Sequence, residues 1–207
     1  MKILVLGSTG FVGKNLVKKL INTNYNVKLT SRKKNNNEIK NTEIIEMDLL
    51  DPYLNFKKLI EDCDTIINCA GEINNEDKMY DLHVLFITKL YQSIFEKYKY
   101  DNKKINWIQL SSVGVYGPPI IPNQNRIINE LSTSRIDIMS VYEKTKLLAD
   151  QYIIDNFNLK IINYCILRPS QIIGDYMPNE SLSQLINIIN KKLFFYIGYK
   201  NAIRAYI

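Results

Sequence analysis

A tyrosine and a lysine four residues apart can form a proton-transfer pair, because a helix places positions i and i+4 on one face. Tyr142 and Lys146 have this spacing in the stretch SVYEKTK. The same spacing joins Tyr53 to Lys57, Tyr100 to Lys104 and Tyr196 to Lys200. Spacing alone therefore cannot identify a site, and the elements that carry each pair must decide.

A second group of residues is suited to holding phosphate. Gly7, Gly10 and Gly13 form a G-x-x-G-x-x-G pattern between an apolar run and a segment of helical periodicity. Glycines at a strand-to-helix turn allow a tight backbone, and the free N–H groups and dipole of the helix favour a pyrophosphate. The alternative is a glycine-rich turn without a ligand, but the position of the pattern favours a cofactor loop.

The residues after the second apolar run bear on the choice of cofactor. NAD-binding proteins usually have an acidic residue there, whereas this chain has Ser31, Arg32 and Lys33. A hydroxyl and cations suit the 2′-phosphate of NADP, although the same residues could simply open a surface loop. Asp48 could contact the adenine amino group, and Asp48 or Asp51 could equally cap a helix. The prediction is NADP or NAD, with NADP favoured by Arg32 and Lys33.

Short apolar runs alternate with helical periodicity along the chain. We expect strands buried on both faces at Lys2–Leu6, Asn26–Thr30, Glu43–Met47, Thr65–Cys69, Asn106–Leu110 and Lys160–Leu167. We expect helices at Lys14–Ile21, Tyr53–Ile60, Lys78–Tyr98, Ser140–Phe157 and Leu182–Lys192. The alternation predicts an α/β fold with a doubly wound parallel sheet of Rossmann type. Residues 33–40 and 117–126 are expected to be loops.

This architecture selects one tyrosine. Ligands of a doubly wound sheet lie beyond the carboxyl ends of the strands, so Ser111 and Ser112, which end the fifth strand, should share an edge with the glycine loop. Only the pair Tyr142 and Lys146 lies on the helix that follows this strand. The other tyrosines are expected in a first helical turn, a polar segment and the C-terminal stretch: Tyr53, Tyr100 and Tyr196.

The motifs, taken in order, resemble the extended short-chain dehydrogenase/reductase family, particularly its nucleotide-sugar epimerases, dehydratases and reductases. The resemblance covers essentially the whole chain. It rests on the glycine loop, Asp48-Leu49, Asn68-Cys69-Ala70-Gly71, SSVGVYG at 111–117, Tyr142-x-x-x-Lys146 and LRPSQIIG at 167–174.

The resemblance implies a role for each matched position. Tyr142 matches the proton donor and acceptor, Lys146 the residue that holds the nicotinamide ribose, and Ser112 the catalytic serine or threonine. Ser112, Tyr142 and Gln171 are implied substrate contacts. Further implied cofactor contacts are Thr9, Phe11, Val12, Leu49, Cys69, Ala70, Gly71, Ser111 and Pro169.

The implied chemistry explains these residue types. A phenol with an ordinary pKa of about 10 must exchange a proton near neutrality. A nearby ammonium and a cationic nicotinamide favour the phenolate, and a shift of about three units corresponds to about 4 kcal/mol. Ser112 would donate a hydrogen bond to the sugar oxygen and orient its carbon for hydride transfer.

The chain also departs from the family pattern. His83 stands where the family often has asparagine, and we expect it to be a packed or hydrogen-bonded residue rather than a proton relay. Phe86 and Ile87 replace a customary small pair, so this helix should pack differently beneath the site. Val113 and Gly114 follow Ser112 where a dehydratase would have an acidic pair, which argues against dehydration.

We therefore expect an epimerase or 4-keto reductase acting on a nucleotide-linked sugar. The alternative is a non-catalytic NAD(P)-binding sensor or assembly protein, which would not need Ser112, Tyr142 and Lys146 together. Family members continue beyond the segment that ends at Ile207. Residues 1–168 are expected to form the dinucleotide-binding domain, and residues 169–207 the start of an incomplete substrate lobe.

Composition limits the remaining classes. With 207 residues, 46% of them hydrophobic and 23% charged, the chain is typical of a globular protein. The net charge of +6 is scattered, which favours phosphorylated ligands over nucleic acid. Cys63, Cys69 and Cys165 lack C-x-x-C spacing and suit buried thiols, so no metal site is predicted. No segment is apolar enough for a signal peptide or a membrane span, so we expect a cytoplasmic protein. A homodimer is the oligomer considered.

Overall fold

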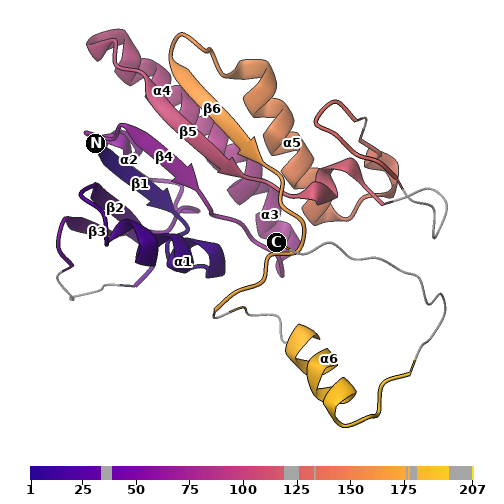
Figure 1. The fold of residues 1–207 in the computed structure, drawn as a ribbon. Coiled ribbons are helices and arrows are strands. Elements are labelled where there is room, and N and C mark those ends of the chain that lie inside the picture. The colour runs from indigo at the N-terminus through magenta and orange to yellow at the C-terminus, as the bar shows by residue number, and fades with distance from the viewer. Residues whose placement is uncertain (34–38, 119–125, 133, 176, 178–180, 196–206) are drawn as a thin grey trace.

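The computed structural model describes residues 1–33, 39–118, 126–132, 134–175, 177, 181–195 and 207. Its centre is a six-stranded sheet with the order β3-β2-β1-β4-β5-β6, parallel at every pairing (Figure 1). The strands are β1 (Lys2–Leu6), β2 (Asn26–Ser31), β3 (Thr42–Glu46), β4 (Thr65–Asn68), β5 (Ile105–Leu110) and β6 (Ile162–Leu167). Strands β1 to β3 are added to the sheet in one direction and β4 to β6 in the other, so the order reverses between β1 and β4. The prediction of a doubly wound parallel sheet is confirmed.

The helices lie where the periodicity predicts, with differences at their ends. They are α1 (Phe11–Leu20), α2 (Phe56–Ile60), α3 (Glu76–Tyr80), α4 (Phe86–Asp101), α5 (Val141–Asn156) and α6 (Ser181–Asn190). The single helix expected over Lys78–Tyr98 is instead α3 and α4 joined by a π-helix at Asp81–Leu85. The prediction that Tyr53 lies in the first turn of a helix was wrong. Asn55 is the N-cap of α2 and accepts a hydrogen bond from the Lys58 N–H, so the helix begins at Phe56.

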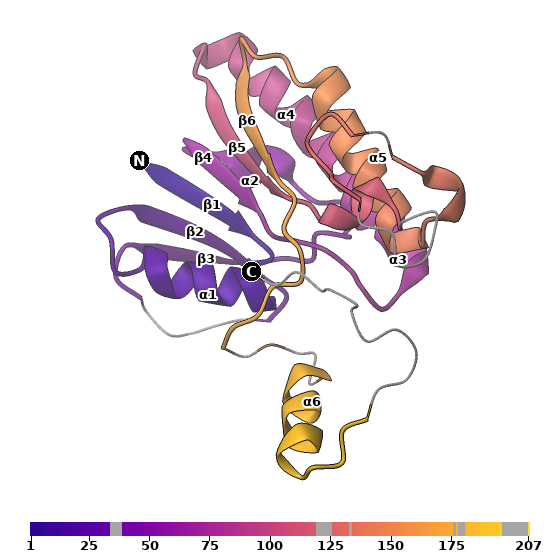
Figure 2. The same cartoon turned by 45° about the vertical axis from the view of Figure 1, so that its right-hand side comes forward.

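Helices lie on both faces of the sheet (Figure 2). Two clusters of apolar side chains hold them there. Ile3, Val5 and residues of β2 pack with the apolar side of α1. Leu4 and Leu6 point to the opposite face, where α2, α4 and α5 contribute the larger cluster. Because successive side chains of a strand alternate, β1 serves both clusters and is almost completely buried.

Burial on both faces was a wrong expectation for the two edge strands, β3 and β6. No residue of β3 is fully buried. Ile162 is buried, but Asn163 and Cys165 are exposed and Leu167 is 48% exposed. These three side chains lie on the same face of the sheet as α1. That helix packs on β1 and β2, and no described helix covers this face at β6. Cys165 is therefore an exposed thiol rather than a buried one, whereas Cys63 is buried and Cys69 half-buried.

The described residues beyond β6 make few contacts with the sheet. Most side chains of α6 are exposed, and both views show this helix standing away from the strands (Figures 1 and 2). The N–H of Ile207 donates to the carbonyl of Gln171 at 3.0 Å. Much of the two expected loops, at 34–38 and 119–125, lies outside the described residues, as does Tyr196.

Among the described residues, no helix combines the length and apolar character needed to cross a bilayer. Within the same residues, no group of three or more histidine, cysteine or acidic side chains could hold a metal ion.

Candidate functional site

The glycine loop forms a tight turn at the end of β1. Gly7 has a φ of +71°, and a Cβ there would lie 2.7 Å from the Cα of Ala70. A Cβ on Gly13 would overlap the carbonyl oxygen of Gly7, so α1 packs directly on the turn. The Gly10 N–H donates to the same Gly7 oxygen at 3.0 Å. Gly7 and Gly13 thus require glycine for backbone packing, as the strand-to-helix pattern predicts.

The N-terminus of α1 is open for an anion. Gly10 is its N-cap and has no side chain to satisfy the first N–H groups, and the first turn, Phe11 to Lys14, contains no acidic residue. Ser8, which is buried, donates its hydroxyl hydrogen to the carbonyl of Thr30 at 2.6 Å and fixes the loop to β2. This arrangement leaves N–H groups and the positive end of the helix dipole facing the sheet edge.

A cavity of about 230 Å³ lies beside this loop, at the carboxyl ends of β1, β2 and β4. Several sequence-predicted residues line it: Gly7, Thr9, Gly10, Arg32, Asp48, Leu49, Cys69, Ala70 and Gly71. Other lining residues were missed: Thr30, Met47, Leu50, Glu72, Lys78 and Leu82. Thr30, Leu50 and Glu72 adjoin predicted positions and could have been found, whereas Lys78 and Leu82 come from the helical segment after β4 and carry no local signal.

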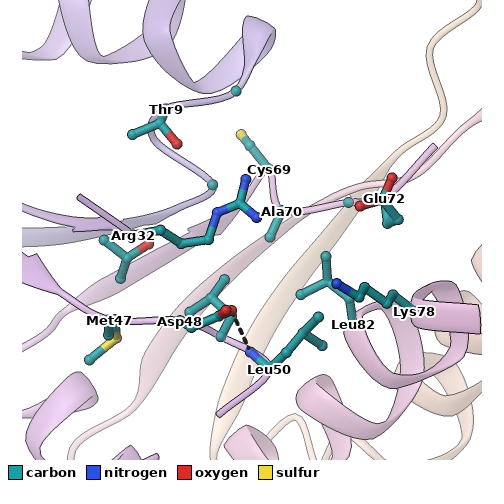
Figure 3. A pocket seen from close by; sticks show the side chains of 15 residues that line it. Thr9, Arg32, Met47, Asp48, Leu50, Cys69, Ala70, Glu72, Lys78 and Leu82 are labelled. Carbon is teal, nitrogen blue, oxygen red and sulfur yellow. Dashed lines mark hydrogen bonds between the residues drawn. The ribbon is translucent and has the colours of Figure 1, made fainter. Parts of the chain in front are cut away.

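Charged side chains of both signs face the cavity. Figure 3 shows Arg32 and Lys78 extending into it from opposite walls. Asp48 also lines it, and its Oδ1 accepts a hydrogen bond from the Leu50 N–H at 3.0 Å. Asp51 likewise closes a local turn, so neither aspartate caps α2, and the capping alternative is wrong.

Some predicted cofactor residues are not among the described residues that line the cavity: Phe11, Val12, Gly13, Ser31, Ser111 and Pro169. Ser31 exchanges hydrogen bonds with the backbone of Lys33. The carbonyl of Pro169 accepts from the Val113 N–H at 3.0 Å and so supports the turn after Ser112. These residues shape the surroundings of the cavity rather than its wall.

The helix α5 presents the tyrosine and lysine. Ser140 and Glu143 form a capping box at its start, with the Ser140 N–H donating to Glu143 Oε2 at 2.8 Å. Burial raises the pKa of Tyr142, and the nearby Ser112 hydroxyl acts in the opposite direction. The side chains of the chain alone therefore hold this phenol protonated. The pair of Tyr142 and Ser112 expected from the sequence does meet.

Lys146 lies one turn further along α5 and is 4% exposed. Its Nζ donates to the carbonyl of Leu110 at 2.9 Å. Burial lowers the pKa of Lys146 to about 8, while Asp150 and Cys69 act in the opposite direction. Its ammonium is thus retained at neutral pH and lost as the pH rises through about 8.

Gly71 connects the two parts of the site. It lines the cavity, and a Cβ on it would lie 3.5 Å from Lys146 Nζ and 3.5 Å from His83 Nε2. The lysine amine is therefore directly behind the cavity wall. Ser112, Tyr142 and Lys146 themselves are not among the described residues that line the cavity.

His83 is buried and fully engaged in hydrogen bonds. Its Nε2 accepts from the Glu72 N–H at 3.0 Å, and its Nδ1 lies 2.8 Å from Thr145 Oγ1. Burial, with the nearby Lys146, lowers the pKa of His83 to about 3. The expectation of a packed, hydrogen-bonded histidine is confirmed.

The bulky pair after His83 is accommodated by a change of helix type. Phe86 and Ile87 are buried in the main cluster. They follow the π-helix, whose wider turn is closed by the Phe86 N–H donating to the Asp81 carbonyl. The expected difference in packing from other family members stays a prediction.

A buried acidic residue that sequence reasoning missed joins Ser111 to β6. Asp150 is 0% exposed, and its Oδ2 accepts from Ser111 Oγ at 2.9 Å and from Arg168 Nε at 2.8 Å. Arg168 in turn donates to the Tyr116 hydroxyl at 2.7 Å. Asp150 follows Lys146 by four residues, and that spacing was the available signal.

The sequence matches a family described as NAD dependent epimerase/dehydratase over residues 3–207. The putative UDP-glucose 4-epimerase of Methanocaldococcus jannaschii is 32% identical over 203 residues, covering 92% of this chain and 62% of that protein. A sterol-4-alpha-carboxylate 3-dehydrogenase (decarboxylating) of Dictyostelium discoideum is 22% identical, covering 95% of this chain and 60% of that protein. The chain thus spans less than two thirds of the length of these relatives.

The solved structure of UDP-glucuronic acid 4-epimerase from Bacillus cereus in complex with NAD has the same fold. Its TM-score is 0.73 at 20% identity, with 93% of this chain and 63% of that chain covered. At this identity the likeness concerns the arrangement of the strands and helices.

Proposed function

Since the chain belongs to the NAD-dependent epimerase/dehydratase family, we propose that it takes part in hydride transfer on a nucleotide-linked sugar with a bound nicotinamide cofactor. The observation that carries this proposal is that the Lys146 amine lies behind the cavity wall at Gly71. Tyr142, one turn earlier on α5, has the Ser112 hydroxyl beside it. Ser112 comes from the turn after β5 and the other two from α5, and only the fold brings them together.

The lining of the cavity suits a dinucleotide. The backbone at Gly7 is packed too tightly for a side chain, and Gly10 leaves the α1 N-terminus free for a pyrophosphate. Arg32 and Asp48 line the same cavity beyond β2 and β3, where the adenosine half would lie. When bound, the nicotinamide accepts a hydride from a sugar carbon and returns it. The residues of the chain then have to bind, orient and exchange protons.

Tyr142 is the proposed proton carrier. It would take the proton of the sugar hydroxyl as the adjoining C–H bond breaks, and return it when that bond forms again. Ser112, through its hydroxyl, would hold the same sugar oxygen and so fix the distance to Tyr142. Because epimerisation removes and restores a proton at one oxygen, a single tyrosine can serve both steps.

The charge balance favours this role only with cofactor present. Burial keeps the pKa of Tyr142 raised. A phenolate there needs positive charge from the Lys146 ammonium together with the oxidised nicotinamide ring. Proton removal by Tyr142 is thereby coupled to the presence of the oxidised cofactor.

A 4-epimerase acting on a UDP-hexose is the preferred form of the activity. Both the curated relative from M. jannaschii and the solved structure from B. cereus carry the name of a UDP-sugar 4-epimerase. A 4-keto reductase that uses NADP is the second form, favoured by Arg32 in the cavity. Residues 169–207, with Gln171, are proposed to begin the sugar-binding part, and a homodimer is the proposed assembly.

The test is turnover of UDP-glucose and UDP-glucuronic acid with NAD, with the 4-epimers identified by proton NMR. Tyr142→Phe should abolish epimerisation and retain NAD binding, whereas Tyr152→Phe, on the same helix, should retain both. Equal turnover by Tyr142→Phe would refute the catalytic assignment. Nucleotide binding without turnover of any sugar would instead favour the non-catalytic sensor.

The choice of cofactor is tested separately by titrating NAD and NADP into the wild type and into Arg32→Asp. A loss of NADP affinity that leaves NAD affinity intact would support a 2′-phosphate contact by Arg32. Parallel losses for both cofactors would show that Arg32 contacts a part they share.

A further inference from the structure

His83 is the single histidine of the chain and is 2% exposed. It lies in the π-helix Asp81–Leu85, between α3 and α4. Neither the glycine loop nor the proposed proton transfer uses it. A buried imidazole in an uncommon helix type next to a cofactor cavity calls for an explanation, because π turns are often found at functional sites.

The hydrogen bonds determine how the imidazole is protonated. The backbone N–H of Glu72 can only donate, so His83 Nε2, at 3.0 Å from that nitrogen, must accept and carry no hydrogen. The ring hydrogen is then on Nδ1, which donates to Thr145 Oγ1 at 2.8 Å. Thr145 in turn donates its hydroxyl hydrogen to a carbonyl of the preceding turn, at 2.9 Å from that of Val141 and 3.1 Å from that of Tyr142. In this one arrangement, each polar side-chain atom of His83 and Thr145 has a hydrogen-bond partner.

The two partners of His83 belong to the two halves of the site. Glu72 lines the cavity next to Gly71, on the segment that leaves β4. Thr145 lies on α5 between Tyr142 and Lys146. The His83 ring also meets the Tyr142 ring edge-on, with centroids 5.8 Å apart and an interplanar angle of 85°.

We propose that His83 is a positioning residue, which ties the cavity segment at Gly71 and Glu72 to the turn of α5 that carries Tyr142 and Lys146. The inference rests on the proposed function and adds a residue to it. Through one ring nitrogen His83 holds the backbone at the cavity wall, and through the other it holds α5. The distance between the bound cofactor and the Tyr142 hydroxyl is thereby set by a single rigid ring.

The π turn explains why a histidine can reach both partners. With i→i+5 bonding, the turn from Asp81 to Phe86 is wider than an α-helical turn. His83 and Val84 are both buried within it, and Phe86 and Ile87 anchor its C-terminal side in the main cluster. Packing of these buried neighbours therefore fixes the imidazole ring, and its two nitrogens form hydrogen bonds with Glu72 and Thr145.

Two substitutions separate the two hydrogen bonds. His83→Asn places an amide N–H near the position of Nδ1 and keeps the donor to Thr145, but it loses the acceptor for Glu72. His83→Gln can place an amide oxygen near the position of Nε2 and keeps that acceptor, but it loses the donor to Thr145. Both variants keep a polar side chain in the buried position, which limits the loss of stability.

The expected results differ between the variants. For His83→Gln, kcat should fall about 10- to 100-fold, with KM and NAD affinity within about threefold of wild type, because α5 is displaced relative to the cofactor. For His83→Asn, NAD affinity should fall about tenfold, with a smaller loss of kcat, because the cavity wall is released. If both variants change only the unfolding midpoint, His83 is a structural residue and the proposal is overturned.

A matched change on the partner side checks the connection. Thr145→Val removes the acceptor for Nδ1 with little change of shape and should reproduce the kcat loss of His83→Gln. The double variant should be no slower than either single variant, because both remove the same bond. Additive losses would mean that the two residues act independently, against the proposal.

A spectroscopic measurement requires no substrate. Nitrogen-15 NMR of the histidine ring reports on His83 alone, since the chain has one histidine. The ring should be neutral with its hydrogen on Nδ1, and NAD should shift the Nε2 signal through Glu72. A hydrogen on Nε2, or a spectrum unchanged by saturating NAD, would overturn the proposal.

These outcomes distinguish the two proposals. If the wild type binds NAD but converts no sugar, the proposed catalytic function is overturned. The role of His83 is then decided by the NAD affinity of His83→Asn and by the nitrogen-15 signals of the histidine ring. A wild type that binds neither NAD nor NADP overturns both proposals.

Discussion

Burial drives several ionisable side chains around Gly71 towards their neutral forms. Burial lowers the pKa of Lys146 to about 8 and that of His83 to about 3. Burial also raises the pKa of the Cys69 thiol to about 11 and that of the Tyr142 phenol. Such a region of low polarity strengthens any charge interaction within it. A single cationic ring bound in the cavity would therefore act strongly on Tyr142, which is the property the proposed chemistry needs.

The pKa of His83 predicts a pH dependence of stability. Unfolding restores the ordinary value of 6.5 in place of about 3, so the unfolded chain binds the proton first as the pH falls. The contribution of neutral His83 is fully present above pH 6.5 and is lost progressively as the pH falls toward 3. Between pH 7 and pH 5 the loss is about 2 kcal/mol.

Urea unfolding at the two pH values measures this loss. The wild type should lose about 2 kcal/mol more than His83→Gln, in which the titrating group is gone. The comparison removes the contribution of the carboxylates that also titrate between pH 5 and pH 7, because both proteins contain them. Both proteins also retain Glu72 and Lys146, the charged groups nearest to His83. Equal losses in the two proteins would show that His83 titrates normally in the folded state.

Gly13 offers a second prediction at the residue scale. A Cβ at this position would overlap the Gly7 carbonyl, so Gly13→Ala should lower the free energy of unfolding by about 2–3 kcal/mol despite the higher helix propensity of alanine. Chemical denaturation measures the change. In the control Gly71→Ala the nearest atoms are at 3.5 Å, which is ordinary contact, and the change should stay within about 1 kcal/mol. A Gly13→Ala protein as stable as wild type would contradict the packing of α1 on the turn.

At the scale of elements, α5 is fixed at its start by the capping box and at its middle by Asp150. The capping box of Ser140 and Glu143 closes the first turn, in which Tyr142 lies. Asp150 then joins α5 to the end of β5 through Ser111 and to the segment after β6 through Arg168. Because Lys146 lies between these two attachments, its amine is held against the Leu110 carbonyl. The edge of the sheet and the helix thus form one rigid support for the site.

Removing Asp150 should therefore be costly. Asp150→Ala leaves Ser111 without its acceptor and the Arg168 guanidinium, which is 17% exposed, without its carboxylate. We expect the free energy of unfolding to fall by about 3 kcal/mol or more. The control Asp155→Ala removes an exposed carboxylate of the same helix that bonds only Gln151 among the described residues, and it should cost less than about 0.5 kcal/mol. Similar losses in both variants, measured by urea denaturation, would count against a structural role for the buried pair.

At the scale of the whole molecule, the cavity lies where the order of the sheet reverses, and its wall is formed by β1, β2, β4 and the π-helical segment. Residues from position 7 to position 82 therefore meet in one volume. A ligand that fills this volume contacts both halves of the sheet and links them.

Cofactor binding should accordingly stabilise the chain as a unit. A ligand that binds only the folded state at a free concentration of 100 times its Kd adds about 2.7 kcal/mol to the free energy of unfolding. We expect NAD to raise the thermal midpoint in a concentration-dependent way, and UDP-sugar alone to raise it less. A midpoint that is unchanged by both NAD and NADP would exclude a dinucleotide site.

The strand and helix order and the glycine turn could be predicted because their signals are local. Apolar runs of β-branched residues, helical periodicity and glycines at a strand-to-helix junction act within a few residues of the chain. The one-sided burial of β6 could not be predicted in this way, because Cys165 and Leu167 are apolar like the buried residues. Their exposure depends on how far α1 reaches across the sheet. The π turn at Asp81–Leu85 was also missed, because its i→i+5 bonding has no residue signature.

By itself, the sequence determined the fold class, the family resemblance and the set of chemically capable residues. It selected one of four Tyr/Lys pairs only through the predicted order of strands and helices, since spacing did not distinguish them. It did not show that Lys78 lines the cavity, or which partners His83 and Asp150 contact. The tertiary structure decided these contacts, because they join segments far apart in the chain. Thr145 meets His83 across 62 residues and Asp150 meets Ser111 across 39, distances over which only the packing of α5 on the sheet brings side chains together.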